Sequence, residues 1–120
     1  MRILLIEPEK APVVKEISGE LKEMQEIVGG TIQAIYPFKE KDIALICNEE
    51  AKLIGLPANR ALMNDDGKIY DVIHGTFFIC GTSEDSFASL THEQIERFTK
   101  EYSIPEMFIV INGKLICFPM

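Results

Sequence analysis

The apolar residues of this chain fall into short runs separated by turn-forming residues. The longest uninterrupted runs, such as residues 3–6 and 108–111, are far shorter than the roughly 20 residues that a membrane-spanning helix needs. Runs of this length are typical of strands. At 120 residues and 47% hydrophobic content, the chain can bury a core without disulfides or metal. We therefore expect one compact domain over residues 1–120, of the α+β class and mainly antiparallel.

The strands are predicted to form three hairpins. Residues 2–6 and 13–17 make the first, and residues 31–38 and 42–48 make the second, around a charged turn. Residues 107–118 make a C-terminal hairpin, because Asn112-Gly113 between two apolar runs is a strong signal for a two-residue turn. Asp66-Gly67 marks a tight turn into the apolar run 69–81, in which Gly75 indicates a bulge or bend.

Two helices are predicted. Residues 18–29 carry apolar side chains at helical spacing and end at Gly29, which supplies a left-handed exit. Thr91 and Gln94 have the spacing of a capping box, so a second helix is expected over residues 92–102. Its buried stripe is formed by Ile95, Phe98 and Tyr102. Residues 49–64 lose any period and are interpreted as an irregular loop with about one helical turn.

The charge of the chain argues against nucleic-acid binding. The net charge is −7, with −2 in residues 1–60 and −5 in residues 61–120, and no basic stripe offsets a phosphate backbone. Such acidity leaves DNA mimicry open as an alternative. The N-terminal apolar run is broken at once by Glu7, Pro8 and Glu9, so no secretory signal is expected and the predicted location is the cytoplasm.

Neither a metal site nor a cofactor is expected. The three cysteines are odd in number and lie in apolar stretches, where they are interpreted as core residues: Cys47, Cys80 and Cys117. A calcium loop around Gly67 fails because Leu62 and Ile73 would stand where oxygen ligands are required. His74 as a general base oriented by Asp71 would need a bulge, because positions 71 and 74 project to opposite faces of an ideal strand.

The aperiodic stretch 48–64 is the predicted ligand site, because it gathers polar groups that no regular element requires: Asn48, Lys52, Asn59 and Arg60. Arg60 is suited to clamp a phosphate or carboxylate with two hydrogen bonds. Aromatic residues nearby in the predicted sheet are suited to stack on a base, and the site set includes Tyr36, Tyr70 and Phe77. Two alternatives stay open. In the first, the asparagines bond to the backbone of turns while Arg60 pairs with Glu49 or Glu50. In the second, the aromatic residues belong to the core.

Several motifs in a fixed order carry a resemblance to a known family. The segments IVGGTIQAIYPF, ALICNEEAKLIGLPANRAL and IYDVIHGTFFICG, followed by SFASLTHEQIERF, are similar to those of small uncharacterised domains encoded by phages and mobile elements of Gram-positive bacteria. The resemblance covers about residues 2–102 and leaves the C-terminal hairpin outside. It implies an accessory protein that acts inside a bacterial host cell, and it offers no catalytic residues to carry over.

The leading hypothesis is a non-enzymatic protein that binds and sequesters a small nucleotide-derived signal of host defence. This hypothesis rests on the resemblance, on the absence of a catalytic constellation and on the polar stretch beside aromatic residues. The alternative is an acidic inhibitor or regulator of a host protein, which would use the charge of the second half of the chain. The apolar C-terminal strands also suggest pairing with a second copy of the chain across a two-fold axis.

Overall fold

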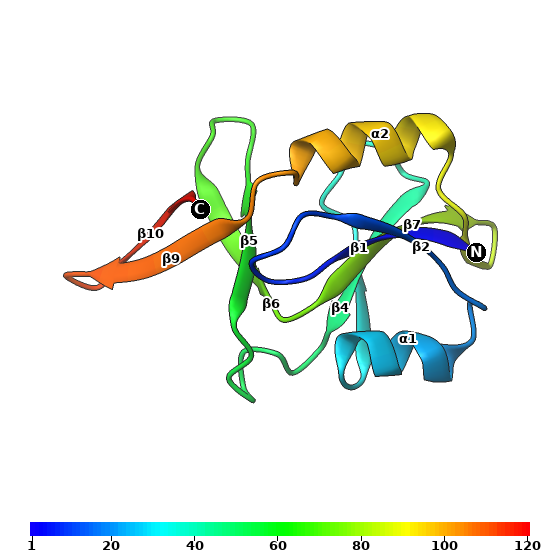
Figure 1. Cartoon of the computed structure of the whole chain (residues 1–120), viewed down its shortest axis with the longest axis horizontal. Helices are drawn as coiled ribbons and strands as arrows, with labels where there is room; N and C mark the ends of the chain where they lie inside the picture. The colour runs from blue at the N-terminus through cyan, green and yellow to red at the C-terminus, as the bar shows by residue number, and fades with distance from the viewer.

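The computed structural model describes all 120 residues and contains a central antiparallel sheet (Figure 1). Its main path runs in the order β2-β1-β7-β4-β3, and β8 pairs with β7. The bounds are Arg2–Ile6 for β1, Val13–Glu16 for β2, Ile32–Ile35 for β3, Ile43–Asn48 for β4, Phe77–Ser83 for β7 and Ser86–Ala88 for β8. The first two predicted hairpins are confirmed by the pairing of β1 with β2 and of β3 with β4. The short β8 was not foreseen.

Two further hairpins lie at the end of the molecule away from the N-terminus (Figure 1). One consists of β5 (Ala58–Met63) and β6 (Ile69–His74), and the other of β9 (Glu106–Ile111) and β10 (Lys114–Pro119). The C-terminal hairpin is thus confirmed. Its turn residues Asn112 and Gly113 both have positive φ, 52° and 78°, as a type I′ turn requires. The molecule is elongated, with extents of 44 × 29 × 23 Å.

A helix covers each face of the central sheet. Helix α1 (Leu21–Val28) lies on one face and α2 (His92–Glu101) on the other (Figure 1). Because successive side chains of a strand point to opposite faces, β1 sends Ile3 into the core beneath α1 and Leu4 into the core beneath α2. Strand β4 is buried along its whole length. This three-layer arrangement confirms the predicted α+β class, and neither helix is long and apolar enough to span a membrane.

The local signals for the helices are confirmed. Thr91 accepts a hydrogen bond from the Gln94 amide, and the Gln94 side chain accepts one from the Thr91 amide, which completes the capping box of α2. The predicted stripe on α2 is buried beneath the helix. Gly29 ends α1 in the left-handed conformation, with φ of 81°.

Gly75 forms the bend between β6 and β7, as its position in the apolar run predicts. Its φ is 77°, a conformation that side chains rarely adopt. A Cβ atom at this position would also lie 2.7 Å from Leu56 Cδ1, so the Leu56 side chain would have to shift. The bend turns the chain out of the β5–β6 hairpin and into the central sheet.

The prediction of an irregular loop over residues 49–64 is wrong in its second half. Residues 58–63 form β5, which pairs antiparallel with β6 through two irregularities in register. Asn59 and Arg60 gave this segment the polarity of a loop, yet they are 0% and 1% exposed. They are tolerated inside because their polar groups bond to backbone carbonyls.

We predict that Asn59→Ala strongly destabilises the fold. The Asn59 amide nitrogen donates to the carbonyls of Ile6 and Gly75, both at 2.9 Å, and its oxygen accepts from Arg60 at 2.8 Å. The variant removes the donor to two buried carbonyls and leaves Arg60 Nη1 with only its longer bond to the backbone carbonyl of residue 59 at 3.4 Å, so the free energy of unfolding is expected to fall by about 3 kcal/mol. Chemical denaturation measures this change.

Asn64→Ala is the matched control for Asn59→Ala. The Asn64 side chain accepts hydrogen bonds from the amides of Asp66 and Lys68, but it lies in an exposed turn. Water replaces those bonds, so a loss of about 1 kcal/mol or less is expected. Equal losses in the two variants would contradict the structural role of Asn59.

Candidate functional site

The structure does not bring the seven predicted site residues to one hollow. The guanidinium of Arg60 is buried and bonds within the protein. Its Nη2 donates to the carbonyls of Lys10 at 2.7 Å and Tyr102 at 3.0 Å, and its Nη1 donates to the Asn59 side chain at 2.8 Å. Burial lowers the pKa of Arg60, an effect that the negative charge of Glu106 opposes. The two-pronged clamp expected of this guanidinium is therefore directed at main-chain and amide oxygens of the chain itself.

The other predicted residues are divided among several parts of the fold, although Asn48 and Lys52 border one hollow and Tyr70 borders another with Arg60. Asn48 is buried and donates to the Val28 carbonyl at 3.1 Å, which ties the end of β4 to the end of α1. Tyr36 and Tyr70 are more than half exposed, and they border different hollows. Phe77 is fully buried in the core, as the alternative interpretation of the aromatics expected.

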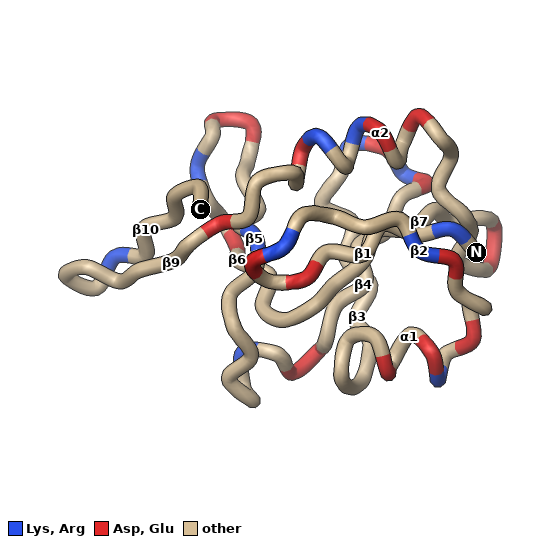
Figure 2. Tube along the Cα trace, in the orientation of Figure 1, with Lys and Arg blue, Asp and Glu red and all other residues tan.

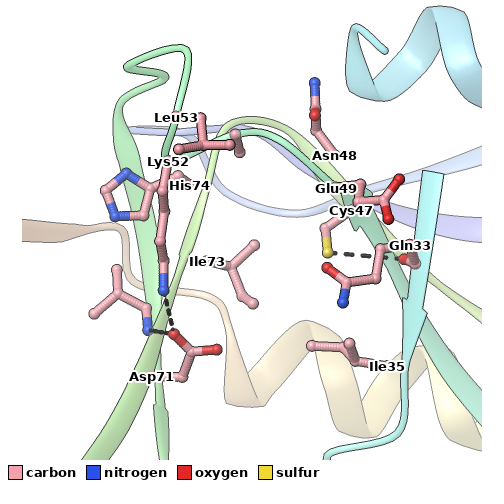
Figure 3. Close-up of a pocket in the computed structure, with 12 residues that line it drawn as sticks. Gln33, Ile35, Cys47, Asn48, Glu49, Lys52, Leu53, Asp71, Ile73 and His74 are labelled. Carbon is pink, nitrogen blue, oxygen red and sulfur yellow. Dashed lines mark hydrogen bonds and ion pairs between the residues drawn. The ribbon is translucent and has the colours of Figure 1, made fainter. Parts of the chain in front are cut away.

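A hollow of about 180 Å³ lies between the end of β4 and strand β6 (Figure 3). Its walls come from β3, from β4 with the turn that follows it, and from β6. The twelve lining residues are Gln33, Ile35, Cys47, Asn48, Glu49, Ala51, Lys52, Leu53, Asp71, Val72, Ile73 and His74. Half of them are hydrophobic. Apolar walls with a few converging polar groups are the usual composition of a small-molecule site.

A second hollow of about 380 Å³ adjoins the first. Four residues line both, namely Lys52, Asp71, Val72 and His74. The remaining walls of the second hollow are Ile69, Tyr70 and Leu115. Three of the predicted site residues therefore border the two adjoining cavities: Asn48 the first, Tyr70 the second and Lys52 both. We refer to the two adjoining cavities as the paired hollows.

An ion pair lies where the paired hollows meet. Lys52 Nζ donates to Asp71 Oδ1 at 2.6 Å, and the Val72 amide donates to the same oxygen at 2.8 Å (Figure 3). Burial by itself would raise the pKa of Asp71, but the hydrogen bonds from Lys52 and Val72 and the charge of Lys52 outweigh it. The net pKa of Asp71 is lowered. Asp71 is thus ionised at neutral pH, and Lys52 is held over the hollow.

The imidazole of His74 is fixed in orientation. Its Nδ1 lies 2.9 Å from the carbonyl oxygen of Leu56, and a carbonyl only accepts, so Nδ1 carries the proton and donates. Nε2 is then left for a ligand. Asp71 and His74 project to opposite faces of an ideal strand, yet both line the first hollow together with Val72 and Ile73 between them, so this hollow borders side chains from both faces of β6.

The thiol of Cys47 borders the first hollow without being a nucleophile. Burial, followed by the negative charge of Asp71, raises the pKa of Cys47 to about 11. The thiol is protonated at neutral pH, and only the thiolate attacks electrophiles. Cys47 and Cys80 are both buried, which confirms the core role predicted for them. Cys117 is half-buried beside Glu106.

The paired hollows are suited to reversible binding of a small polar molecule. The chain has no group of three or more His, Cys, Asp or Glu residues that could hold a metal ion. The first hollow is smaller than the roughly 300–1,000 Å³ of typical small-molecule sites, so by itself it admits one ring-sized group. The second hollow adds room for a substituent on the far side of Lys52.

Comparison with known proteins yields one family. The model of a family described as a domain of unknown function (DUF3846) matches residues 1–103. The matched region includes every residue of the paired hollows except Leu115, and it ends before β9. No match was found among the curated proteins or among the solved structures.

We predict that Lys52→Ala raises the pKa of Asp71. The variant removes the hydrogen bond and the positive charge that lower this pKa, while burial, which raises it, remains. A carboxyl whose folded pKa is lowered adds stability above its unfolded pKa and loses it as pH falls through the folded pKa. The variant should therefore be less stable than the wild type at neutral pH but lose less stability as pH falls through the acid range, because less of its stability depends on an ionised Asp71. NMR titration of the Asp71 carboxyl carbon measures the shift.

Lys39→Ala is the control for this titration, because Lys39 forms an ion pair with Asp65 in which both side chains are 88% exposed. That pair lies outside the paired hollows, so its removal should leave the pKa of Asp71 unchanged. An unchanged Asp71 pKa in Lys52→Ala would show that the ion pair at the hollows does not form in solution.

Proposed function

The chain belongs to the DUF3846 family, and we propose that it is a non-catalytic binding protein that holds a small nucleotide-derived molecule in the paired hollows. The observation that carries the proposal is the convergence of Lys52, Asp71 and His74 at the boundary of two adjoining cavities with partly apolar walls. The raised pKa of the neighbouring Cys47 thiol keeps it protonated at neutral pH, which argues against thiolate chemistry beside this group.

The charge of the lining limits the ligand to few negative groups. Lys52 is the single Lys or Arg that borders the paired hollows, whereas Asp71 and Glu49 contribute two carboxylates. A ligand with several phosphates would meet uncompensated repulsion there. A nucleoside or nucleoside monophosphate therefore suits the site better than the dinucleotides that an exposed Arg60 would have favoured.

The proposed binding mode divides the ligand between the two hollows. Its base enters the first hollow, where Ile35 and Ile73 form apolar walls and the polar atoms of Gln33 are available to the base edge. Its phosphate lies in the second hollow and replaces Asp71 as the partner of Lys52. This exchange is feasible because the Asp71 side chain is 40% exposed and keeps the Val72 amide as a donor.

The proposed cellular role is sequestration of a host-defence signal by a protein of a phage or mobile element. It is supported by the similarity of the motifs in residues 2–102 to domains of such elements, and by a site suited to binding rather than turnover. The alternative role, inhibition of a basic host protein, gains less support from the surface. Figure 2 shows the acidic residues in several separate loops and on both helices rather than on one face.

We predict that calorimetric titration detects binding of an adenosine monophosphate and weaker binding of adenosine. The difference arises because adenosine lacks the charged group that pairs with Lys52. In Lys52→Ala the affinity for the monophosphate should fall about tenfold or more, since a hydrogen bond to a charged group contributes about 1.5–3 kcal/mol. The affinity for adenosine should change little.

Lys39→Ala again serves as the matched lysine control and should bind as the wild type does. A panel that adds guanosine, cytidine and uridine monophosphates and cyclic dinucleotides covers the other nucleotide-derived signals. Absence of heat with every member would overturn the proposal. Equal loss of binding in both lysine variants would assign the effect to net charge rather than to the paired hollows.

A further inference from the structure

The C-terminal hairpin has an outer face that nothing covers. Cross-strand partners share a face of a hairpin, and one face combines Met107 with Phe118, Ile109 with Ile116, and Ile111 with Lys114. The four most exposed apolar side chains of this outer face are Met107, Ile109, Ile111 and Ile116, which are 37–48% exposed. The hairpin projects from the rest of the molecule in Figure 1.

Near its base the opposite face of the hairpin contacts the domain, whereas towards the tip its paired residues Val110 and Leu115 are 69% and 45% exposed. Glu106 accepts a hydrogen bond from the Ala61 amide of β5 at 2.8 Å, and Cys117 donates to the other oxygen of Glu106 at 3.2 Å. Leu115 borders the second of the paired hollows. A two-stranded hairpin in water is marginally stable at best, and this one has support only near the base of its inner face.

The charge distribution favours a second copy of the chain as the partner of the outer face. The net charge of −7 makes two copies repel over most of their surfaces. From residue 107 to residue 120 there is no acidic side chain, and the single charge is Lys114 (Figure 2). The hairpin is thus the segment through which two acidic copies approach each other with least repulsion.

Two unpaired charges lie at opposite ends of the hairpin. Lys114 follows the turn at the tip and forms no ion pair within the chain. Glu9 also forms none, and it lines a hollow with Met107 and Met120 at the base of the hairpin. If two hairpins pack face to face and run in opposite directions, each tip lies over the base of the other. A two-fold axis then brings Lys114 of each copy towards Glu9 of its partner.

We propose that two copies of the chain form a dimer through the outer faces of their β9–β10 hairpins, with Lys114 paired to Glu9 across the two-fold axis. The exposed apolar area of this face is roughly 300 Å², within the range of the largest patch on a typical monomer. A standard interface buries about 800 Å² per partner. The dimer is therefore weak and forms at micromolar or higher concentration. It is independent of ligand binding in the paired hollows.

Sedimentation velocity of the full chain at rising concentration tests the dimer. The expected result is a shift from the 13.5 kDa monomer to twice that mass. Ile109→Lys should abolish the shift, because it places a charge at the centre of the outer face. Leu21→Lys is the matched control, since Leu21 is a 55% exposed apolar residue on α1, and it should dimerise as the wild type does. A wild-type chain that stays monomeric up to millimolar concentration would overturn the proposal.

Charge reversal separates this specific dimer from general association. Glu9→Lys reduces the magnitude of the net charge from −7 to −5, since one acid becomes one base, so weaker repulsion alone would strengthen association. The proposed pairing predicts the opposite, a several-fold weaker dimer. Lys114→Glu should weaken it as well, and the double variant should restore wild-type affinity because its net charge returns to −7 and the pair is exchanged. Failure of the double variant to restore the dimer, with both single variants weakened, would rule out this two-fold arrangement.

The charge-reversal variants are controlled for folding by circular dichroism, since both positions are exposed and a native spectrum is expected. Hydrogen exchange on the wild type gives a readout that needs no variant. Protection of β9 and β10 should increase with protein concentration, and protection of α1 should not. Concentration-independent exchange in the hairpin would contradict the proposal. A heteromeric partner that bound the outer face while the wild type stayed monomeric would also overturn it.

Discussion

The structure depends on the buried pair Asn59 and Arg60. Through their side chains, strand β5 is bonded to the end of β1, to the bend at Gly75, to the loop that follows β1 and to the end of α2. A guanidinium without an acidic partner is expensive to bury, and here neutral oxygens satisfy all of its nitrogens except Nε. The pair holds the β5–β6 hairpin against the central sheet. Apolar contacts alone would fix the position of this hairpin less specifically.

The paired hollows are a consequence of that junction. Strand β6 pairs with β5, and the chain enters the central sheet only after the bend at Gly75. The side chains of β6 therefore face the end of β4 across a gap, and the two strands do not pair. Lys52, from the turn after β4, reaches across this gap to Asp71. The site is thus formed by segments about twenty residues apart in sequence, and its geometry follows from the position of the hairpin rather than from any short motif.

Local signals in the sequence predicted much of the fold. A type I′ turn at Asn112-Gly113, a capping box at Thr91 and a glycine exit at Gly29 each act within a few residues, so their outcome does not depend on the rest of the chain. Strand β5 was missed because its polar residues point inward. Of the site residues, Asn48, Lys52 and Tyr70 were predicted and do border the paired hollows. Asp71 and His74 were considered as a general base and its partner, but they were left out of the predicted site because they project to opposite faces of an ideal strand.

The sequence by itself determined the class of the fold, the two helices, three of the hairpins and the acidic character of the surface, since these follow from periodicity, turn chemistry and composition. The tertiary structure decided which polar residues border the paired hollows and which hold the interior together. An arginine and two asparagines look the same in a sequence whether their partners are solvent, ligand or main-chain carbonyls. Only the positions of those carbonyls, brought in from residues as distant as Ile6 and Tyr102, assign them to the core.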